Sequence, residues 1–201
     1  KGTWKYYGDE EEPKLHTGWF EAVPSKELNS DDHENGTTHW YYANSKGEIT
    51  IPTADGEVGV VKTIDGKSYL FNSDGEMVTG LRILTYDGSK ITNISSEVDT
   101  ADTVKNMNSD TMKLVYFESN GAAKTGTTTI TLDVTSYTFS FKSNGSPRGV
   151  GETGISDGYI YQNGLRLTAD EDTKYGVVTY KNESYVVNEK GSIQKNKKHL
   201  K

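Results

Sequence analysis

The sequence predicts an all-β protein, a solenoid-like succession of β-hairpin repeats with short insertions. Three observations on the 201-residue chain support this class. Tyr and Gly are abundant, at 13 and 21 residues, which suits short strands joined by tight turns. Hydrophobic residues, Tyr included, make up only 32% of the chain, which is low for a single thick core. Similar turn segments also recur along the whole length, as repeat architectures require.

Six polar segments that end in glycine form this recurrence. Each follows a short aromatic strand, and period-two alternation is clearest at Tyr137, Phe139 and Phe141. Asp-Gly or Asn-Gly after such a strand indicates a hairpin, because the turn needs a positive φ that glycine adopts without cost. The six segments are residues 44–47, 72–75, 118–121, 142–145, 162–164 and 188–191.

Two longer segments match each other as strand, turn and strand. Residues 59–69 and 176–185 align on Gly59 and Gly176, with a difference of one residue in length. Asp65-Gly66 is a clear turn in the first segment, whereas the second has a less regular Lys-Asn-Glu sequence. We expect both segments to form hairpins.

Three regions follow from this pattern, within what we expect to be one continuous array. Residues 1–84 hold hairpin repeats, an aromatic cluster and an acidic insert, and residues 25–38 read as a hydrophilic loop. Residues 85–112 are a polar insert or a degenerate repeat, in which residues 100–107 have a weak tendency to form helical turns. Residues 113–201 hold further hairpins and a basic tail.

Residues 61–80 resemble one full repeat of the cell-wall-binding family, which includes choline-binding proteins, glucan-binding domains and clostridial toxin repeats. The segments Gly18-Trp19-Phe20 and Trp40-Tyr41-Tyr42 are similar to the Gly-Trp and Trp-Tyr-Tyr landmarks of that family. Residues 137–198 also resemble wall-binding segments of Firmicutes surface proteins. The resemblance implies a non-catalytic stack of hairpins that binds a surface polymer.

Aromatic residues near the N-terminus are the candidate binding site. Aromatic faces stack on sugar rings, and an aromatic cage attracts a choline cation by roughly 0.5–2 kcal/mol. The alternative is that these rings form the core, because a thin hairpin stack has little else to bury. Later repeats lack the Gly-Trp and Trp-Tyr pairs, which weakens the case for choline. The candidate residues are Trp4, Tyr6, Trp19, Phe20, Trp40, Tyr42 and Met77.

Composition excludes several other classes of function. The net charge is −7, and an acidic chain without a basic stripe is poorly suited to binding nucleic acid. The chain has no Cys, so neither disulfides nor thiolate metal sites are expected. No apolar run approaches the roughly 18 residues of a membrane span. Lys190 and Lys195 open a basic tail, which we interpret as solvated.

The motifs that would indicate an enzyme or a metal site lack the context that each requires. Residues 149–154 spell GxGxxG, but turn and strand residues follow instead of the helix that a dinucleotide site needs. With Gly36 at position six, the acidic insert has no terminal Glu for a calcium loop. The four histidines, at positions 16, 33, 39 and 199, show no ligand spacing. We therefore expect no enzyme, no cofactor and no metal.

The leading hypothesis is a module that attaches a secreted bacterial protein to a cell-wall polysaccharide or a choline-bearing polymer, at the cell surface. A host glycan or a protein is a further candidate partner. The alternative hypothesis is a spacer or adhesin scaffold, whose recognition lies in the inserts at residues 25–38 and 85–112. The chain opens at Lys1-Gly2-Thr3-Trp4, as if within a motif, so we expect it to be a fragment or mature piece of a longer protein.

Overall fold

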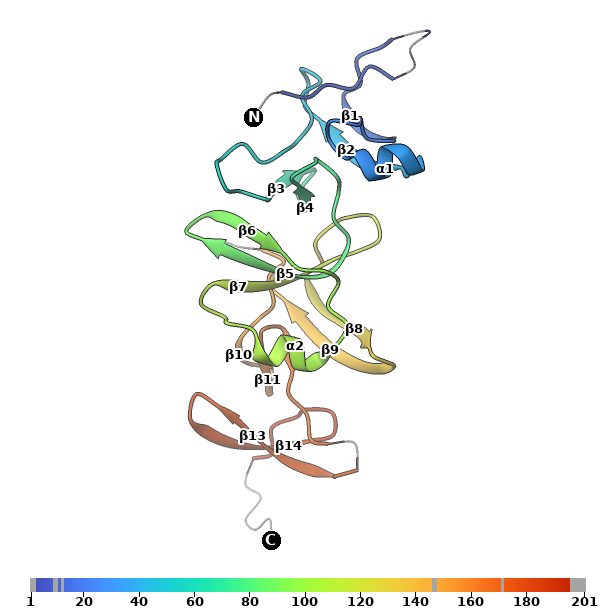
Figure 1. Cartoon of the computed structure of the whole chain (residues 1–201). Coiled ribbons are helices and arrows are strands. Elements are labelled where there is room, and N and C mark those ends of the chain that lie inside the picture. The colour runs from blue at the N-terminus through green and yellow to red at the C-terminus, as the bar shows by residue number, and fades with distance from the viewer. Residues whose placement is uncertain (1–2, 9–10, 12, 146–147, 171, 196–201) are drawn as a thin grey trace. The chain divides into compact units, whose positions relative to one another are not determined.

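The computed structural model confirms the all-β class (Figure 1). It describes residues 3–8, 11, 13–145, 148–170 and 172–195. Within these residues, antiparallel strands alternate with turns, and the two helices, α1 and α2, have six residues each. The chain divides into two compact units: Lys1–Glu97 with Tyr116–Ala123, and Val98–Val115 with Lys124–Lys201.

The first unit begins with an antiparallel hairpin whose connection contains a helix. Strand β1 (Gly18–Ala22) pairs with β2 (His39–Ala43), and α1 (Ser30–Asn35) lies between them in the sequence. A five-stranded sheet follows, in the order β4-β3-β6-β5-β7. Its strands are β3 (Gly59–Ile64), β4 (Lys67–Asn72), β5 (Gly80–Asp87), β6 (Lys90–Ile94) and β7 (Met112–Phe117), and residues 112–115 of β7 are counted in the second unit.

The second unit contains α2 (Ala101–Asn106), a five-stranded sheet and a separate hairpin. The sheet order is β10-β11-β12-β9-β8, and the hairpin is β13-β14. Phe139 and Phe141 on β9 are fully buried, so aromatic rings supply much of the core here, as the composition suggests. The strands are β8 (Gly126–Leu132), β9 (Thr135–Phe141), β10 (Gly154–Ser156), β11 (Tyr159–Gln162), β12 (Leu165–Arg166), β13 (Tyr175–Tyr180) and β14 (Glu183–Asn188).

The recurring turns close in a common way. In three of them the first residue is an Asn whose Oδ1 accepts hydrogen bonds from the backbone N–H groups two and four residues later; these are Asn44, Asn72 and Asn188. The turn glycine has a positive φ, 81° at Gly75 and 78° at Gly121. Close packing requires glycine as well, because a Cβ at Gly121 would collide with the side chain of Met77. Backbone conformation and contact together therefore fix this residue.

Backbone hydrogen bonds link five of the six turns to the preceding repeat. The residue two positions after the turn glycine donates its N–H to a carbonyl one repeat earlier, at 2.8–2.9 Å. The carbonyl belongs to a residue near the start of the previous aromatic segment. The pairs are Ile49 to Trp4, Met77 to Trp40, Ala123 to Ser68, Gly151 to Leu114, and Ile193 to Gly158. In the Gly151 pair the turn glycine is Gly149, and not the Gly145 that the sequence predicts.

The structure corrects the fourth predicted turn. The closing hydrogen bond runs from Gly149 N–H to the Lys142 carbonyl, so this turn extends four residues beyond Gly145. Gly145 also has a positive φ of 80°, as a closing glycine does. Its Cβ position, however, is open. Sequence spacing alone did not separate the two glycines.

The structure also corrects the alignment of the two long hairpins. Each has six-residue strands and a two-residue turn, so their lengths are equal. Gly59 pairs with Asn72 at the end of its hairpin, and the residue that pairs with Asn188 is Tyr175 rather than Gly176. The apparent difference of one residue arose because the glycines were aligned instead of the turns.

Both inserts contain secondary structure. The expected helical turns at residues 100–107 are confirmed as α2, capped by Thr100. The segment at residues 25–38, expected to be a loop, instead contains α1, because Asn29 caps its N-terminus and Gly36 ends it with a φ of 66°. The insert at 85–112 also contains β6, which pairs with β5. The end of the basic tail, from residue 196, lies outside the described residues.

Candidate functional site

The register of the β1–β2 hairpin sorts the candidate aromatic residues onto two faces. Trp19 pairs with Tyr42, Phe20 pairs with Tyr41, and Glu21 pairs with Trp40. Because neighbouring residues of a strand point to opposite faces, Trp19 and Phe20 cannot line the same groove. One face therefore carries Phe20 and Tyr41, and the other carries Trp19, Trp40 and Tyr42.

The face with Phe20 forms the core of this hairpin. Phe20 and Tyr41 are buried, and Trp4 and Tyr6 pack partly buried against them. The ring of Tyr6 stacks on Phe20 with centroids 4.9 Å apart, and Phe20 stacks on Tyr41 at 5.6 Å. Three predicted site residues, Trp4, Tyr6 and Phe20, thus pack in or against this core, as the alternative interpretation expected.

A pocket of about 60 Å³ lies beside this core, lined by Trp4, Phe20 and Tyr41 among others. Tyr41 and Ser25 both line it, and their hydroxyls are buried without a hydrogen-bond partner among the described residues. Burial, together with the carboxylates of Glu76, Asp74 and Asp32, raises the pKa of Tyr41 well above its usual range. At about 60 Å³ this pocket is far smaller than the roughly 300–1,000 Å³ of ordinary small-molecule sites.

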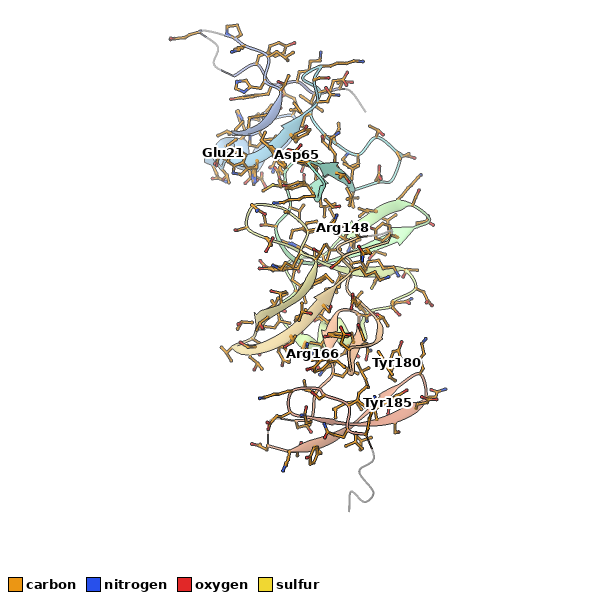
Figure 2. All side chains as sticks on the ribbon, turned by 180° about the vertical axis from the view of Figure 1, so that it is seen from behind. Glu21, Asp65, Arg148, Arg166, Tyr180 and Tyr185 are labelled. Atoms are coloured by element: carbon orange, nitrogen blue, oxygen red, sulfur yellow. The ribbon has the colours of Figure 1, made fainter. Side chains whose placement is uncertain are left out.

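The opposite face is an aromatic surface, which we call the aromatic face: Trp19, Trp40 and Tyr42, with Tyr69 from β4. Trp19 meets Tyr42 edge-on at 5.2 Å between centroids and Tyr69 at 4.8 Å. Trp40 is 45% exposed, although large aromatic side chains are usually covered. Glu21, labelled in Figure 2, lies opposite Trp40 in the hairpin register. The aromatic face therefore offers an exposed indole beside half-buried rings.

The chain places its own cation on this face. The ammonium of Lys62, on β3, lies 5.6 Å from the centroid of Tyr42. That distance is within the range of a cation–π interaction. Part of the aromatic surface that could attract a ligand cation is therefore already next to a positive charge.

Met77 differs from the other candidates in its contacts. Its backbone N–H donates to the carbonyl of Trp40 at 2.8 Å, which links the segment after the Gly75 turn to β2. Its side chain is half-buried and packs at the Cα of Gly121. Stacking of the next turn therefore occupies the surface that a ligand would need.

A polar cleft of about 360 Å³ lies beside the aromatic face, lined by residues of the first unit that include Glu48, Thr50, Val61 and Lys62. None of its lining residues is aromatic. The cleft is large enough for a small polar group and shares Lys62 with the aromatic face. It can therefore extend the contact of a ligand that rests on Tyr42.

Two aromatic residues of the second unit, Tyr159 and Tyr161, lie against an arginine. The Arg166 guanidinium, labelled in Figure 2, lies 3.9 Å from the Tyr159 ring centroid and 5.5 Å from that of Tyr161. Its Nη2 donates to the Tyr161 hydroxyl at 2.9 Å. This unit has no Trp, since all three lie in the first 40 residues. The arrangement leaves no aromatic surface for a ligand cation at these two rings.

One polar cluster was not predicted from the sequence. Asp32, His39 and Glu76 bring one ligand atom each to within 4.8 Å of one another. They come from α1, from β2 and from the residue after the Gly75 turn, and no spacing rule joins positions 32, 39 and 76. The available signal was that His39 shares a strand face with Tyr41, two residues later.

The structure confirms the strand and turn expected after the GxGxxG sequence. Gly154, its last residue, begins β10, and a turn and β11 follow. Gly151 is needed for packing, because a Cβ there would meet the backbone of Asn163 at 2.5 Å. In the part of the chain that the structure describes, no helix is long and apolar enough to cross a membrane.

No protein-family model matches the chain, and no curated protein matches it. Among solved structures, the chain is similar to choline binding protein F of Streptococcus pneumoniae, with 18% identity over 96% of this chain and 54% of that one, at a TM-score of 0.28. CbpJ of the same organism has 18% identity over 90% and 49%, at 0.26. Alternansucrase of Leuconostoc mesenteroides has 15% identity over 89% and 13%, at 0.31.

Residues 61–80 resemble a repeat of a family that includes choline-binding proteins, and such proteins are among the similar structures. The chain spans about half the length of these two proteins. TM-scores near 0.3 mean that the whole chains do not superimpose.

Proposed function

We propose that this chain is a non-catalytic module that binds a carbohydrate polymer of the bacterial cell wall through its aromatic face, as part of a secreted or surface-attached protein. The observation that carries the proposal is the exposed indole of Trp40 next to Trp19 and Tyr42 on one face of the first hairpin. Exposed aromatic rings of this kind stack on the C–H faces of sugars.

A neutral sugar fits this face better than a choline group does. A choline cation would need open ring faces, but the Lys62 ammonium lies near Tyr42. The rings of Trp19, Tyr42 and Tyr69 also contact one another edge to face, so they do not enclose a vacant cage. The exposed surface is that of Trp40, and a flat ring suits a pyranose. Choline-bearing polymers are the competing ligand in the test.

Only the first unit carries the proposed site. In the second unit Arg166 lies over the rings of Tyr159 and Tyr161, and in the first unit Trp4, Tyr6 and Phe20 pack in or against the core. Of the seven candidate residues, Trp19, Trp40 and Tyr42 therefore remain as proposed contacts. Tyr69 joins them because its ring meets Trp19.

The test is retention of the full chain on insoluble polymers. Purified peptidoglycan, an α-glucan and a choline resin are compared; similar structures were determined in the presence of a peptidoglycan analogue and with isomaltononaose. We expect retention on a glycan and at least about tenfold weaker binding by Trp40→Ala, which corresponds to about 1.4 kcal/mol.

The matched control is Tyr7→Ala, which removes an exposed aromatic ring, 51% accessible, that lies outside the aromatic face. It should bind as the wild type does. Retention on choline resin alone, with elution by free choline, would show that the ligand is choline and not a glycan. If no polymer retains the chain, or if Trp40→Ala binds normally, the proposal is wrong and the inserts become the candidate recognition surface.

A further inference from the structure

The structure brings three metal-ligating side chains of the first unit together on the far side of β2 from Trp40. The Nε2 atom of His39 lies 2.9 Å from Asp32 Oδ2 and 3.7 Å from Glu76 Oε1. A neutral imidazole and two carboxylates form a donor set that divalent transition ions accept. Glu76 is 8% exposed, so its charge is largely removed from water.

We propose that Asp32, His39 and Glu76 bind a divalent transition-metal ion, and that Zn²⁺ fits this donor set best. In a tetrahedral site with bonds of about 2.0–2.1 Å, ligand atoms lie about 3.3 Å apart. The observed separations of 2.9 Å and 3.7 Å lie on either side of that value. Shifts of about 0.4 Å would bring both of these separations to that value, and all three ligand atoms lie within 4.8 Å of one another.

An outer layer of amides already orients the carboxylates. The Asn29 side-chain amide donates to Asp32 Oδ2 at 2.7 Å and to Glu76 Oε1 at 3.0 Å. The Asn72 amide donates to the other Glu76 oxygen, Oε2, at 2.8 Å. Hydrogen bonds of this type hold ligating carboxylates in place at metal sites.

A buried hydroxyl without a partner belongs to a residue on the same strand face as His39. Tyr41 follows His39 by two residues, is 2% exposed, and its hydroxyl has no partner among the described residues.

The charge balance also favours a cation. Among the residues that the structure describes, His39 is the only basic side chain that forms an ion pair with Asp32 or Glu76. A bound divalent ion would neutralise both carboxylates while His39 remains neutral. Such an ion would also join α1, β2 and the Gly75 turn, which are held together here without disulfides. This inference departs from the sequence-based expectation of no metal, and it does not depend on polymer binding.

The test is calorimetric titration of Zn²⁺ into the full chain, prepared without a histidine tag and freed of metal with a chelator. We expect one Zn²⁺ per chain and a rise in the thermal midpoint of several degrees. His39→Ala and Glu76→Gln should lose at least tenfold in affinity. Asn29→Ala should lose about 10–100-fold, as changes to outer-layer partners do.

His33→Ala is the matched control, because His33 lies on α1 but bonds to the Pro24 carbonyl rather than to the cluster. It should bind Zn²⁺ as tightly as the wild type. Asp32→Asn, on an exposed six-residue helix, separates loss of a ligand from loss of folding when near-ultraviolet circular dichroism is unchanged. Absence of saturable binding, or equal binding by His39→Ala and the wild type, would overturn the proposal.

Discussion

The two units use aromatic residues in opposite ways. In the first unit Trp40 is 45% exposed and lies with Trp19 and Tyr42 on one face of a hairpin. In the second unit Tyr161 is 4% exposed, and Arg166 lies over it and over Tyr159. An aromatic strand thus presents an exposed ring in the first unit, whereas in the second unit an arginine of the same chain packs on two rings of an aromatic strand. The comparison therefore favours rings such as Trp40, which the chain leaves exposed, as candidates for binding.

The same comparison applies to buried hydroxyls. Tyr41 and Tyr161 are both buried, but only Tyr161 accepts a hydrogen bond, from Arg166 at 2.9 Å. Tyr41 has none among the described residues. In the second unit the Tyr161 hydroxyl is thus paired, although Arg166 Nε is buried without a partner among the described residues, whereas in the first unit the Tyr41 hydroxyl itself is unpaired.

The largest expected effect separates the packed Trp from the exposed one. Trp19→Ala should lower the free energy of unfolding of the first unit by about 3 kcal/mol, because Trp19 contacts Tyr42, Tyr69 and Phe71. Trp40→Ala should cost less than about 1 kcal/mol, since much of its ring is already in water. Urea unfolding followed by Trp fluorescence reports this unit alone, because all three Trp lie in it. Equal losses would show that the aromatic face is ordinary core.

The next prediction tests whether the contacts of Arg166 with Tyr159 and Tyr161 stabilise the second unit. Arg166→Ala should destabilise that unit by about 2 kcal/mol, because two rings lose their cation and Tyr161 loses its donor. Lys62→Ala, its counterpart in the first unit, should cost about 0.5 kcal/mol, since a single 5.6 Å contact is lost. Far-ultraviolet circular dichroism follows both transitions. If Arg166→Ala leaves stability unchanged, the two units do not differ in how cations stabilise their aromatic rings.

The third effect has opposite signs in the two units. Tyr41→Phe, measured with a chelator at pH 7, should raise stability by about 1 kcal/mol, because it removes a buried hydroxyl without a partner. Tyr161→Phe should lower stability by about 1 kcal/mol, because it removes the acceptor of Arg166. Loss of stability in both variants would mean that Tyr41 has a partner in solution.

Tyr41 also makes the stability of the first unit depend on alkaline pH. Burial, followed by Glu76, Asp74 and Asp32, raises the pKa of Tyr41 in the folded chain. Above about pH 10 the unfolded chain releases this proton while the folded chain keeps it, so stability falls as pH rises. Tyr41→Phe should show a shallower decline than the wild type in urea unfolding at pH 9, 10 and 11. Parallel declines would assign the loss to other groups.

The smallest effect compares two turns. Val134, in the β8–β9 turn, is 95% exposed and has a φ of 64°, which strains a β-branched residue. Gly66 holds the equivalent place in the β3–β4 turn with a φ of 76°. Val134→Gly should stabilise the second unit by about 1 kcal/mol, and Gly66→Val should destabilise the first by a similar amount, as its Cβ position is open. Thermal unfolding measures both; unchanged midpoints would mean that neither turn is strained.

The repeating hairpins could be predicted because their signals are local. Asn-Gly and Asp-Gly turns follow from two adjacent residues, and the β11–β12 and β3–β4 hairpins have the expected two-residue connections. The split of Trp19 from Phe20 could also have been predicted, because adjacent strand residues face opposite ways. The extended turn ending at Gly149 was missed because two glycines, both with positive φ, compete for one role.

The Asp32–His39–Glu76 cluster could not be predicted from spacing. Its members are 7 and 37 positions apart and meet only because α1 lies against β2 and the Gly75 turn follows the next strand pair. Long-range arrangements of this kind depend on the whole unit and not on any short pattern. The division into residues 1–84, 85–112 and 113–201 stays a prediction, and the two compact units are defined by the fold.

The hydrogen bonds that join five of the turns to the preceding repeat have a consequence for protein engineering. The acceptors are main-chain carbonyls, and the residues that provide them carry an indole at Trp4 and Trp40, a hydroxymethyl group at Ser68, an isobutyl group at Leu114 and only hydrogen at Gly158. Attachment therefore does not depend on which side chain stands at this position. Recognition chemistry can be rewritten one repeat at a time, for example by Ser68→Trp, while the backbone connections of the array are kept.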